Sequence, residues 1–285
     1  MELGRARIFI QVEAMQKIIL SRKGFDSSAG GKPSPIFPNG QMFSIPIPTK
    51  YSSHQTFEDI RKGDYSGADA LRQVNANKIL SSGACHYDPQ LASQEGLFGQ
   101  VGKVQTELDK HSVSSGDLFL FFGWFRDYSQ TERIDVHQIF GWLEIEKIIH
   151  GTSRIKDYCD SLNAKHPHAI NDYSNNALYV GKKTSVFSSN DLNVPGYGEF
   201  RKTNSELVLT EMGKSRSNWI MPSKYFSEEK NPRLFSNRLR WNGENDNRIQ
   251  CKGYGQEFII DVDQNPSAID WARSIICENV KGNLY

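Results

Sequence analysis

Short apolar runs separated by polar, glycine-rich segments dominate the hydrophobic pattern of this chain. The run 18–20 (Ile-Ile-Leu) and the run 118–122 (Leu-Phe-Leu-Phe-Phe) each predict a buried strand. Apolar residues alternate with other residues over 138–149, which predicts a strand that pairs antiparallel with 118–122. In that strand Glu144 and Glu146 are expected to point away from the core.

Longer segments with apolar residues at helical spacing predict helices over 68–80, 99–111, 151–162 and 266–276. Gln100 then lies at the entrance of the second helix, where free backbone N–H groups can bind an anion. His166 and His168 flank Pro167. Because a proline disfavours helix in the preceding residue, this segment is predicted to be extended.

These elements predict an α+β fold with a mixed, largely antiparallel sheet or barrel-like core and flanking helices. A Gly-Asp turn, an apolar strand and a glycine-containing strand follow one another from Gly116, a pattern similar to the barrel of the PUA, ASCH and EVE folds. Residues 1–14 are expected to be an N-terminal extension, with polar residues too early for a secretory signal. Residues 15–285 are expected to form one domain, because no repeat or long linker divides them.

Composition narrows the classes of function. Hydrophobic residues make up 38% of the 285 residues and aromatic residues 11%, which is enough for a real core and argues against disorder. The net charge of +1 means that any nucleic-acid surface must be a local patch. The four cysteines are widely spaced and form no C-x-x-C pair, which favours a reducing, cytoplasmic location. No apolar run approaches the roughly 20 residues that span a bilayer, so no membrane partner is expected.

The segment that follows the first predicted strand carries the most suggestive chemistry. Arg22 and Lys23 can hold phosphate, and Phe25 can stack on a base. Asp26 can stabilise a cationic sugar or activate water. The alternative is an ordinary solvated turn, because loops are commonly rich in such residues.

Other residues are candidates for the same site. Asp88 and Glu257 are further candidate catalytic carboxylates. Trp124 is a candidate ring on which a base can stack, and the alternative is that it is a core residue. Cations interleaved with aromatic residues over 230–252 suggest binding of single-stranded nucleic acid or of a flipped base. The alternative is an ordinary solvated face. The other predicted binding residues are His86, Gln100, His168, Arg238, Arg240 and Gln256.

The same residues bear on a metal site. His166 and His168 could bind one metal ion, but no further ligands can be identified from the sequence. Hydrogen bonding or phosphate contact is therefore preferred for them, and no metal or cofactor is expected.

The ordered motifs ILSRKGFDSSAGGKPSPI, CHYDP, GQVGKVQ, GDLFLFFGWFR, IFGWLEI, HPH and GYGQEFIID resemble the third class of nucleotide-modification-associated domains. The resemblance runs through nearly the whole chain from Met15 onward. It implies a prokaryotic or phage protein linked to DNA modification or its countermeasures, with modified DNA as the partner. The segment after Cys85 departs from the expected acidic form, because Gln90 replaces an acid, and this argues against a metal there.

Three activities are compatible with these candidate residues. A metal-independent DNA glycosylase that excises a modified base needs a carboxylate, a base pocket and cations, which the segment ending at Asp26 offers. A non-catalytic reader of modified bases needs only the pocket and the basic strip, and a nuclease would need carboxylates around a metal ion. The glycosylase, acting in anti-phage defence, is preferred. A kinase is disfavoured because the chain has no G-x-x-x-x-G-K-[ST] loop.

Overall fold

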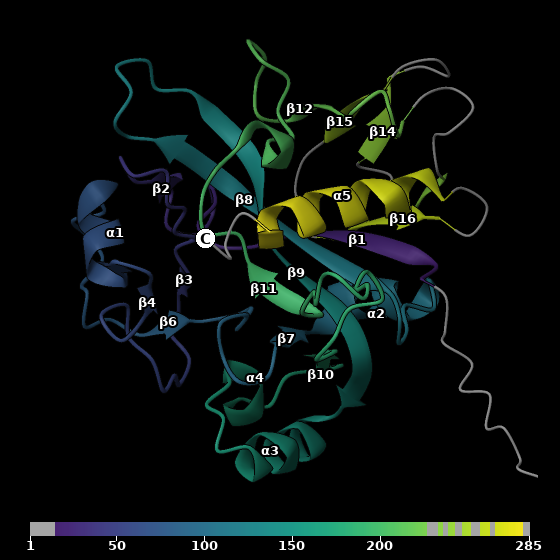
Figure 1. The fold of residues 1–285 in the computed structure, drawn as a ribbon. Coiled ribbons are helices and arrows are strands. Elements are labelled where there is room, and N and C mark those ends of the chain that lie inside the picture. Colours follow the sequence, from purple (N-terminus) through teal and green to yellow (C-terminus); the bar gives the residue numbers. More distant parts are fainter. Residues whose placement is uncertain are drawn as a thin grey trace, which may run out of the picture.

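The computed structural model describes residues 15–226, 233–235, 239–242, 247–251, 257–262 and 266–281, and of 233–235 and 239–240 only the backbone (Figure 1). Its central feature is a nine-stranded mixed sheet in which seven strands follow the order β13-β16-β1-β8-β9-β10-β7. Strand β2 adds to β8, and β11 adds to β9.

The centre of the sheet is built from the apolar runs. Strand β1 (Lys17–Arg22) pairs in parallel with β8 (Leu118–Asp127) and antiparallel with β16 (Glu257–Asp261). Strand β8 pairs antiparallel with β9 (Asp135–His150). The predicted central strands and their antiparallel pairing are therefore confirmed.

The sheet is open. Its path ends at β13 on one side and at β7 on the other, so the barrel-like closure expected from the sequence is not formed by the described strands. The α+β class and the mixed, mostly antiparallel pairing are as predicted. The outer strands are β13 (Arg233–Phe235), β10 (Ala177–Gly181), β7 (Leu97–Gln100), β2 (Ser34–Ile36) and β11 (Tyr197–Glu199).

Helices flank the sheet. Helix α5 runs across it and buries Trp271 and Ile276 in the main core (Figure 1). Helix α3 packs Ile155 and Cys159 against Leu178 of β10. The helices are α1 (Gly67–Gln73), α2 (Gly102–Lys110), α3 (Thr152–Ser161), α4 (Pro167–Ile170) and α5 (Ser267–Lys281), with a 3-10 turn at Ser205–Leu207.

A second, smaller core lies beside the main sheet. Phe43, Phe57 and Leu71 pack there with α1 and with Cys85 of strand β6. This unit holds β6 and the residues after it in place next to β1. Its short strands are β3 (Ile47–Pro48), which pairs with β6 (Cys85–His86), and β4 (Arg61–Lys62), which pairs with β5 (Tyr65–Ser66). A separate three-stranded sheet contains β12 (Asn218–Ile220), β15 (Arg248–Cys251) and β14 (Leu239–Trp241).

Two predicted helices have different bounds. The segment expected as one helix over 99–111 starts as strand β7, because residues up to Gln100 pair with β10, and the helix begins only at Gly102. Gln100 is thus the last residue of strand β7 and directly precedes Val101, the N-cap of α2. Helix α1 ends at Gln73 instead of continuing to residue 80, and Asn75 follows in the left-handed region with φ 53°.

Two further expectations are wrong. His166 is the N-cap of the short helix α4, with Pro167 in its first turn, so the segment is not extended. Glu144 does not face away from the core, because β9 is covered on both faces. Its carboxylate is fully buried and accepts hydrogen bonds from Lys182 Nζ and Ser185 Oγ, each at 2.7 Å.

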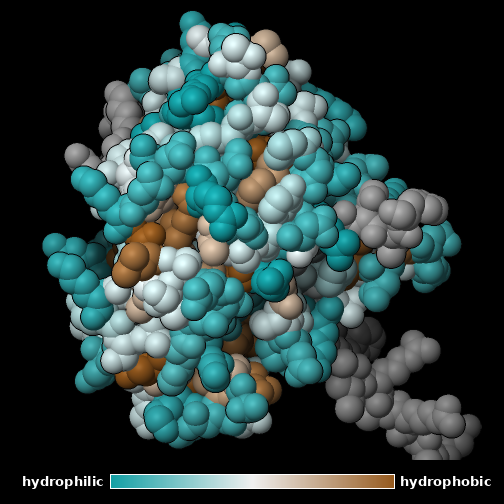
Figure 2. Space-filling view, turned by 90° about the vertical axis from the view of Figure 1, so that its left-hand side faces the viewer, coloured by the Kyte–Doolittle hydropathy of each residue, from teal (hydrophilic) through white to brown (hydrophobic). Residues whose placement is uncertain are grey.

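The surface is mainly polar. On the face drawn in Figure 2, hydrophobic residues form small separate areas between hydrophilic ones. None of the helices that the structure describes is long and apolar enough to cross a membrane. All four cysteines are free thiols, in agreement with their spacing in the sequence.

Candidate functional site

A cavity of about 710 Å³ opens where β1, β6, β7 and α4 come together. We call it the histidine pocket, after the two histidines in its wall. It forms here because β1 and β7 both end at this edge, while β6 and α4 approach from the small core and from α3. Seven of the residues predicted from the sequence line it: Arg22, Lys23, Asp26, His86, Asp88, Gln100 and His168.

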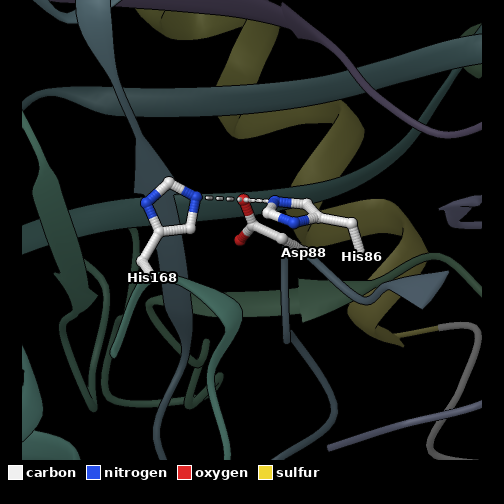
Figure 3. Close-up of side chains that lie close together, drawn as sticks. All are labelled: His86, Asp88 and His168. Carbon is white, nitrogen blue, oxygen red and sulfur yellow. Dashed lines mark ion pairs between the residues drawn. The ribbon is translucent and has the colours of Figure 1, made fainter. Parts of the chain in front are cut away.

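Two imidazole rings face one carboxylate in the wall of the pocket (Figure 3). Asp88 Oδ2 lies 3.8 Å from His86 Nε2 and 3.7 Å from His168 Nε2. These three atoms all lie within 4.8 Å of one another. The arrangement gathers an anionic oxygen and two ring nitrogens at one point.

The carboxylate of Asp88 is fixed from its other side. Its Oδ1 accepts a hydrogen bond from Gly99 N–H at 3.0 Å and lies 3.3 Å from His166 Nε2. Burial by itself would raise the pKa of Asp88. The contacts from His166 and His86 outweigh it and hold the pKa well below its usual range. Asp88 is therefore an anion at neutral pH, with Oδ2 directed at the two rings.

The ring of His168 is oriented by Asn176. Its Nδ1 lies 2.8 Å from Asn176 Oδ1, and Asn176 Nδ2 donates to His168 O and to Thr152 Oγ1, which identifies Oδ1 as the acceptor. Burial lowers the pKa of His168 to about 4, so the ring is neutral at neutral pH. The proton is then assigned to Nδ1, and Nε2 presents a lone pair to Asp88.

Glu257 lies behind the pocket wall. Its Oε1 accepts hydrogen bonds from Gln100 Nε2 at 2.6 Å, Lys23 Nζ at 2.8 Å and Ser21 Oγ at 2.9 Å. The Glu257 side chain is 4% exposed, and its Oε2 has no hydrogen-bond partner among the described residues. Glu257 thus holds Lys23 and Gln100 at the pocket wall.

Asp26 lies at the mouth of the pocket. Its Oδ1 accepts hydrogen bonds from Ser28 N–H, Ser28 O–H and Ala29 N–H, each at 2.7 Å. These contacts form an Asx turn that fixes the carboxylate. All three end on Oδ1, so Oδ2 accepts no side-chain or backbone hydrogen bond from the described residues and faces the cavity mouth.

A second cavity of about 870 Å³ adjoins the first, and we call it the arginine groove. Arg22, Asp26 and Ser28 line both cavities, so these residues mark their junction. The Nε atom of Arg22 is buried and has no hydrogen-bond partner in the described part of the chain. The groove is lined by four positively charged residues, Arg22, Arg133, Lys214 and Arg216, and by three negatively charged residues, Asp26, Glu132 and Asp135.

The groove contains an aromatic platform. Trp124 lines it, and the Arg216 guanidinium lies 4.1 Å from the centre of a Trp124 ring. Arg216 also donates to Ser27 Oγ at 2.9 Å. Stacked arginine and tryptophan are common in sites for unpaired nucleotides.

Some predicted residues lie elsewhere. Phe25 is 1% exposed and belongs to the small core, where its ring packs under Gly30, so it presents no face to a base. Arg238 and Gln256 lie outside the described residues. Arg240 belongs to β14, of which only the backbone is described at that position.

Sequence reasoning missed several residues of the pocket. Tyr51 and Tyr173 line it, with ring centres 6.0 Å apart, and Asn176 supports His168. His166, which the sequence indicates, lies beside Asp88. Tyr51 is 65% exposed, which is unusual for so large an aromatic ring. Only the H-P-H pattern gave a local signal, because the other residues meet through the fold.

The structure also bears on metal binding. Among the described residues, the group of side chains close enough to share an ion is His86, Asp88 and His168. Asp26 and Glu257 are not part of that group, so the three carboxylates do not form the cluster that a nuclease would need. Gln90, which replaces the expected acid, instead donates to the carbonyl oxygens of Tyr87 and Lys165. It thereby ties the segment before α4 to the wall of the pocket.

The fold and the cavity define the class: an α+β protein with a pocket lined by histidines, cations and carboxylates at the edge of an open mixed sheet. The chain belongs to the nucleotide modification associated domain 3 family, whose model matches residues 17–261. No curated protein and no solved structure is significantly similar to it.

Proposed function

We propose that this protein binds DNA and removes a modified base by hydrolysis of its N-glycosidic bond. The observation that carries the proposal is the position of Asp26 at the junction of two adjoining cavities. The arginine groove holds four cations against three carboxylates and suits phosphates, whereas the histidine pocket is lined by aromatic rings and fixed polar groups and suits a base. The sugar that connects a base to its phosphate would lie between them, next to Asp26.

Each cavity has groups for its part of the nucleotide. In the arginine groove, Arg22 has an unpartnered buried Nε, and Trp124 with Arg216 offers a stacking platform. In the histidine pocket, Lys23 and Gln100 are held by Glu257. Amide and ammonium donors in fixed positions can read the polar edge of a flipped base. The family supports the general theme of nucleotide modification.

Asp26 would act on the sugar. The bond between C1′ and the base nitrogen breaks, a water oxygen bonds to C1′, and the second water proton ends on the departing base. A carboxylate beside C1′ stabilises the positive charge that develops on the sugar, or orients and deprotonates the water. Because the turn fixes Oδ1, Oδ2 is held in position without reorganisation during the reaction.

The test is base release by the purified protein. Oligonucleotides with plain and modified bases are incubated with the protein, and free base and abasic sites are measured by mass spectrometry. We expect Asp26→Asn to abolish release and to leave DNA affinity within a few-fold, since an asparagine oxygen keeps the turn. Asp191→Asn, at an exposed position outside both cavities, is the matched control.

Two results would contradict the proposal. One is retained base release by the Asp26→Asn variant. The other is binding of modified DNA by the wild-type protein with no release on any substrate, which would favour the non-catalytic reader instead.

A further inference from the structure

The geometry around Asp88 suits the binding of one metal ion. Two ligand atoms at a tetrahedral angle around a metal with bonds of about 2.1 Å lie about 3.4 Å apart. Asp88 Oδ2 lies 3.8 Å from His86 Nε2 and 3.7 Å from His168 Nε2. Asp88 Oδ2 therefore needs to approach each ring nitrogen by only a few tenths of an ångström, and the three ligand atoms lie within 4.8 Å of one another.

The supporting contacts are those of metal ligands. Histidines that bind metals usually donate their second ring nitrogen to a neighbouring oxygen, and ligating carboxylates are hydrogen-bonded in turn. His168 contacts Asn176 Oδ1 through Nδ1. Asp88 Oδ1 accepts the Gly99 N–H and lies 3.3 Å from His166 Nε2, whereas Oδ2 faces the two rings. Each of these two side chains is thus held from behind while its free atom points at the common centre.

We infer that His86 Nε2, Asp88 Oδ2 and His168 Nε2 bind one divalent transition-metal ion, with open coordination positions toward the histidine pocket. Two imidazole nitrogens and one carboxylate favour zinc, iron, cobalt or nickel over magnesium and calcium, which prefer oxygen ligands. The three ligands all line the pocket, so a bound ligand or water can reach the remaining positions. This centre replaces the sequence-based expectation that no metal is needed.

The metal also narrows the class of substrate. This step rests on the proposed function, because it takes the histidine pocket to be the base pocket. A base whose oxygen or nitrogen donor reaches the open positions can complete the coordination, whereas a base whose modification blocks or lacks such a donor there cannot. The metal site itself requires no assumption about base excision.

Metal binding by the tag-free protein tests the inference. After treatment with a chelator, the protein is titrated with Zn²⁺ in a calorimeter and with Co²⁺ in a spectrophotometer, and Mg²⁺ serves as the comparison ion. We expect one ion per chain, a visible absorption band for Co²⁺, a higher unfolding temperature with Zn²⁺ and no measurable Mg²⁺ binding. None of these readouts depends on base release, so failure of the metal site and failure of the glycosylase are distinguishable.

Variants identify the ligands. His86→Ala and Asp88→Asn should weaken Zn²⁺ binding by at least about 100-fold, and Asn176→Ala by about 10- to 100-fold. The His86 side chain is 21% exposed, so its replacement leaves the fold intact even where changes at the buried His168 do not. His150→Ala, at an exposed histidine outside the pocket, is the control. Absence of one-to-one binding, or equal binding by the His86→Ala and His150→Ala variants, would overturn the inference.

Discussion

Lys23, Phe25 and Asp26 are near neighbours in the chain but occupy three different environments. Lys23 pairs with the buried carboxylate of Glu257 at 2.8 Å, and its ammonium lies 4.6 Å from the centre of the Phe98 ring. Phe25 is a core residue, while Asp26 faces two cavities. Strand β1 ends at Arg22, and Gly24 has a φ of 79°, so the backbone turns between Lys23 and Phe25 and lets these side chains enter different environments.

Replacing Phe25 should mainly affect stability, whereas replacing Trp124 should mainly affect DNA binding. Phe25→Ala removes a fully buried ring and should lower the free energy of unfolding by about 3–5 kcal/mol, with discrimination between modified and plain DNA unchanged. Trp124→Ala should instead weaken binding of single-stranded DNA by about 1–3 kcal/mol, because it removes the groove's stacking platform. Urea unfolding and DNA titration of both variants provide the comparison. A Phe25→Ala variant that keeps its stability but loses discrimination would assign Phe25 to the site.

At the scale of elements, the pocket depends on how closely α4 approaches β7. A Cβ atom on Gly99 would lie 2.3 Å from ring atoms of His168, so only a glycine lets the ring pack against this strand. The same residue donates its N–H to Asp88. Strand β7 thereby positions two of the three proposed ligands through a single residue.

Gly99→Ala tests this packing. The added methyl group should push the His168 ring away, at a cost of about 1–3 kcal/mol in the free energy of unfolding. It should also weaken Zn²⁺ binding, because the ring can no longer reach the position opposite Asp88. Calorimetry and urea unfolding measure the two effects. If neither the free energy of unfolding nor the Zn²⁺ affinity changes, helix α4 can move to accommodate the methyl group, and the close packing of Gly99 is not required.

For the whole molecule, buried histidines make stability depend on pH. His137 is 3% exposed in β9, and its Nδ1 accepts a hydrogen bond from Trp219 Nε1 at 3.1 Å. Burial, with the charges of Arg22 and Arg216, lowers its pKa from 6.5 to about 3. The unfolded chain therefore takes up a proton below about pH 6.5, whereas the folded protein does not until about pH 3. Stability is full above pH 6.5 and is lost as the pH falls between these values.

Near pH 5, His137 is expected to lower the free energy of unfolding by about 1.4 kcal/mol for each unit by which the pH falls. His168 acts in the same direction, because burial lowers its pKa to about 4. Urea unfolding between pH 7.5 and 4.5 measures the slope for the wild-type protein. His137→Gln removes one titrating group and should make the slope shallower by that amount. Identical slopes for the two proteins would show that His137 keeps its ordinary pKa in the folded state.

The sequence by itself determined the centre of the sheet and the family. The runs in β1, β8 and β9 are apolar and bounded by polar or glycine-containing segments, so local pattern alone specifies these buried strands and the antiparallel pairing of β8 with β9. It also indicated seven residues that line the histidine pocket, because cations, carboxylates and histidines at the ends of elements are conspicuous. The ordered motifs indicated the family, which the match over residues 17–261 shows.

Only the tertiary structure decided which of these residues meet. His86, Asp88 and His168 come from β6, the residues after it and α4, and no local pattern records that β7 brings them together. The burial of Phe25 and Glu144 was equally hidden, because burial depends on what other segments place against a side chain. Local sequence specifies how a segment folds, whereas contacts between distant segments decide which side chains share a site and whether that site is suited to a metal ion.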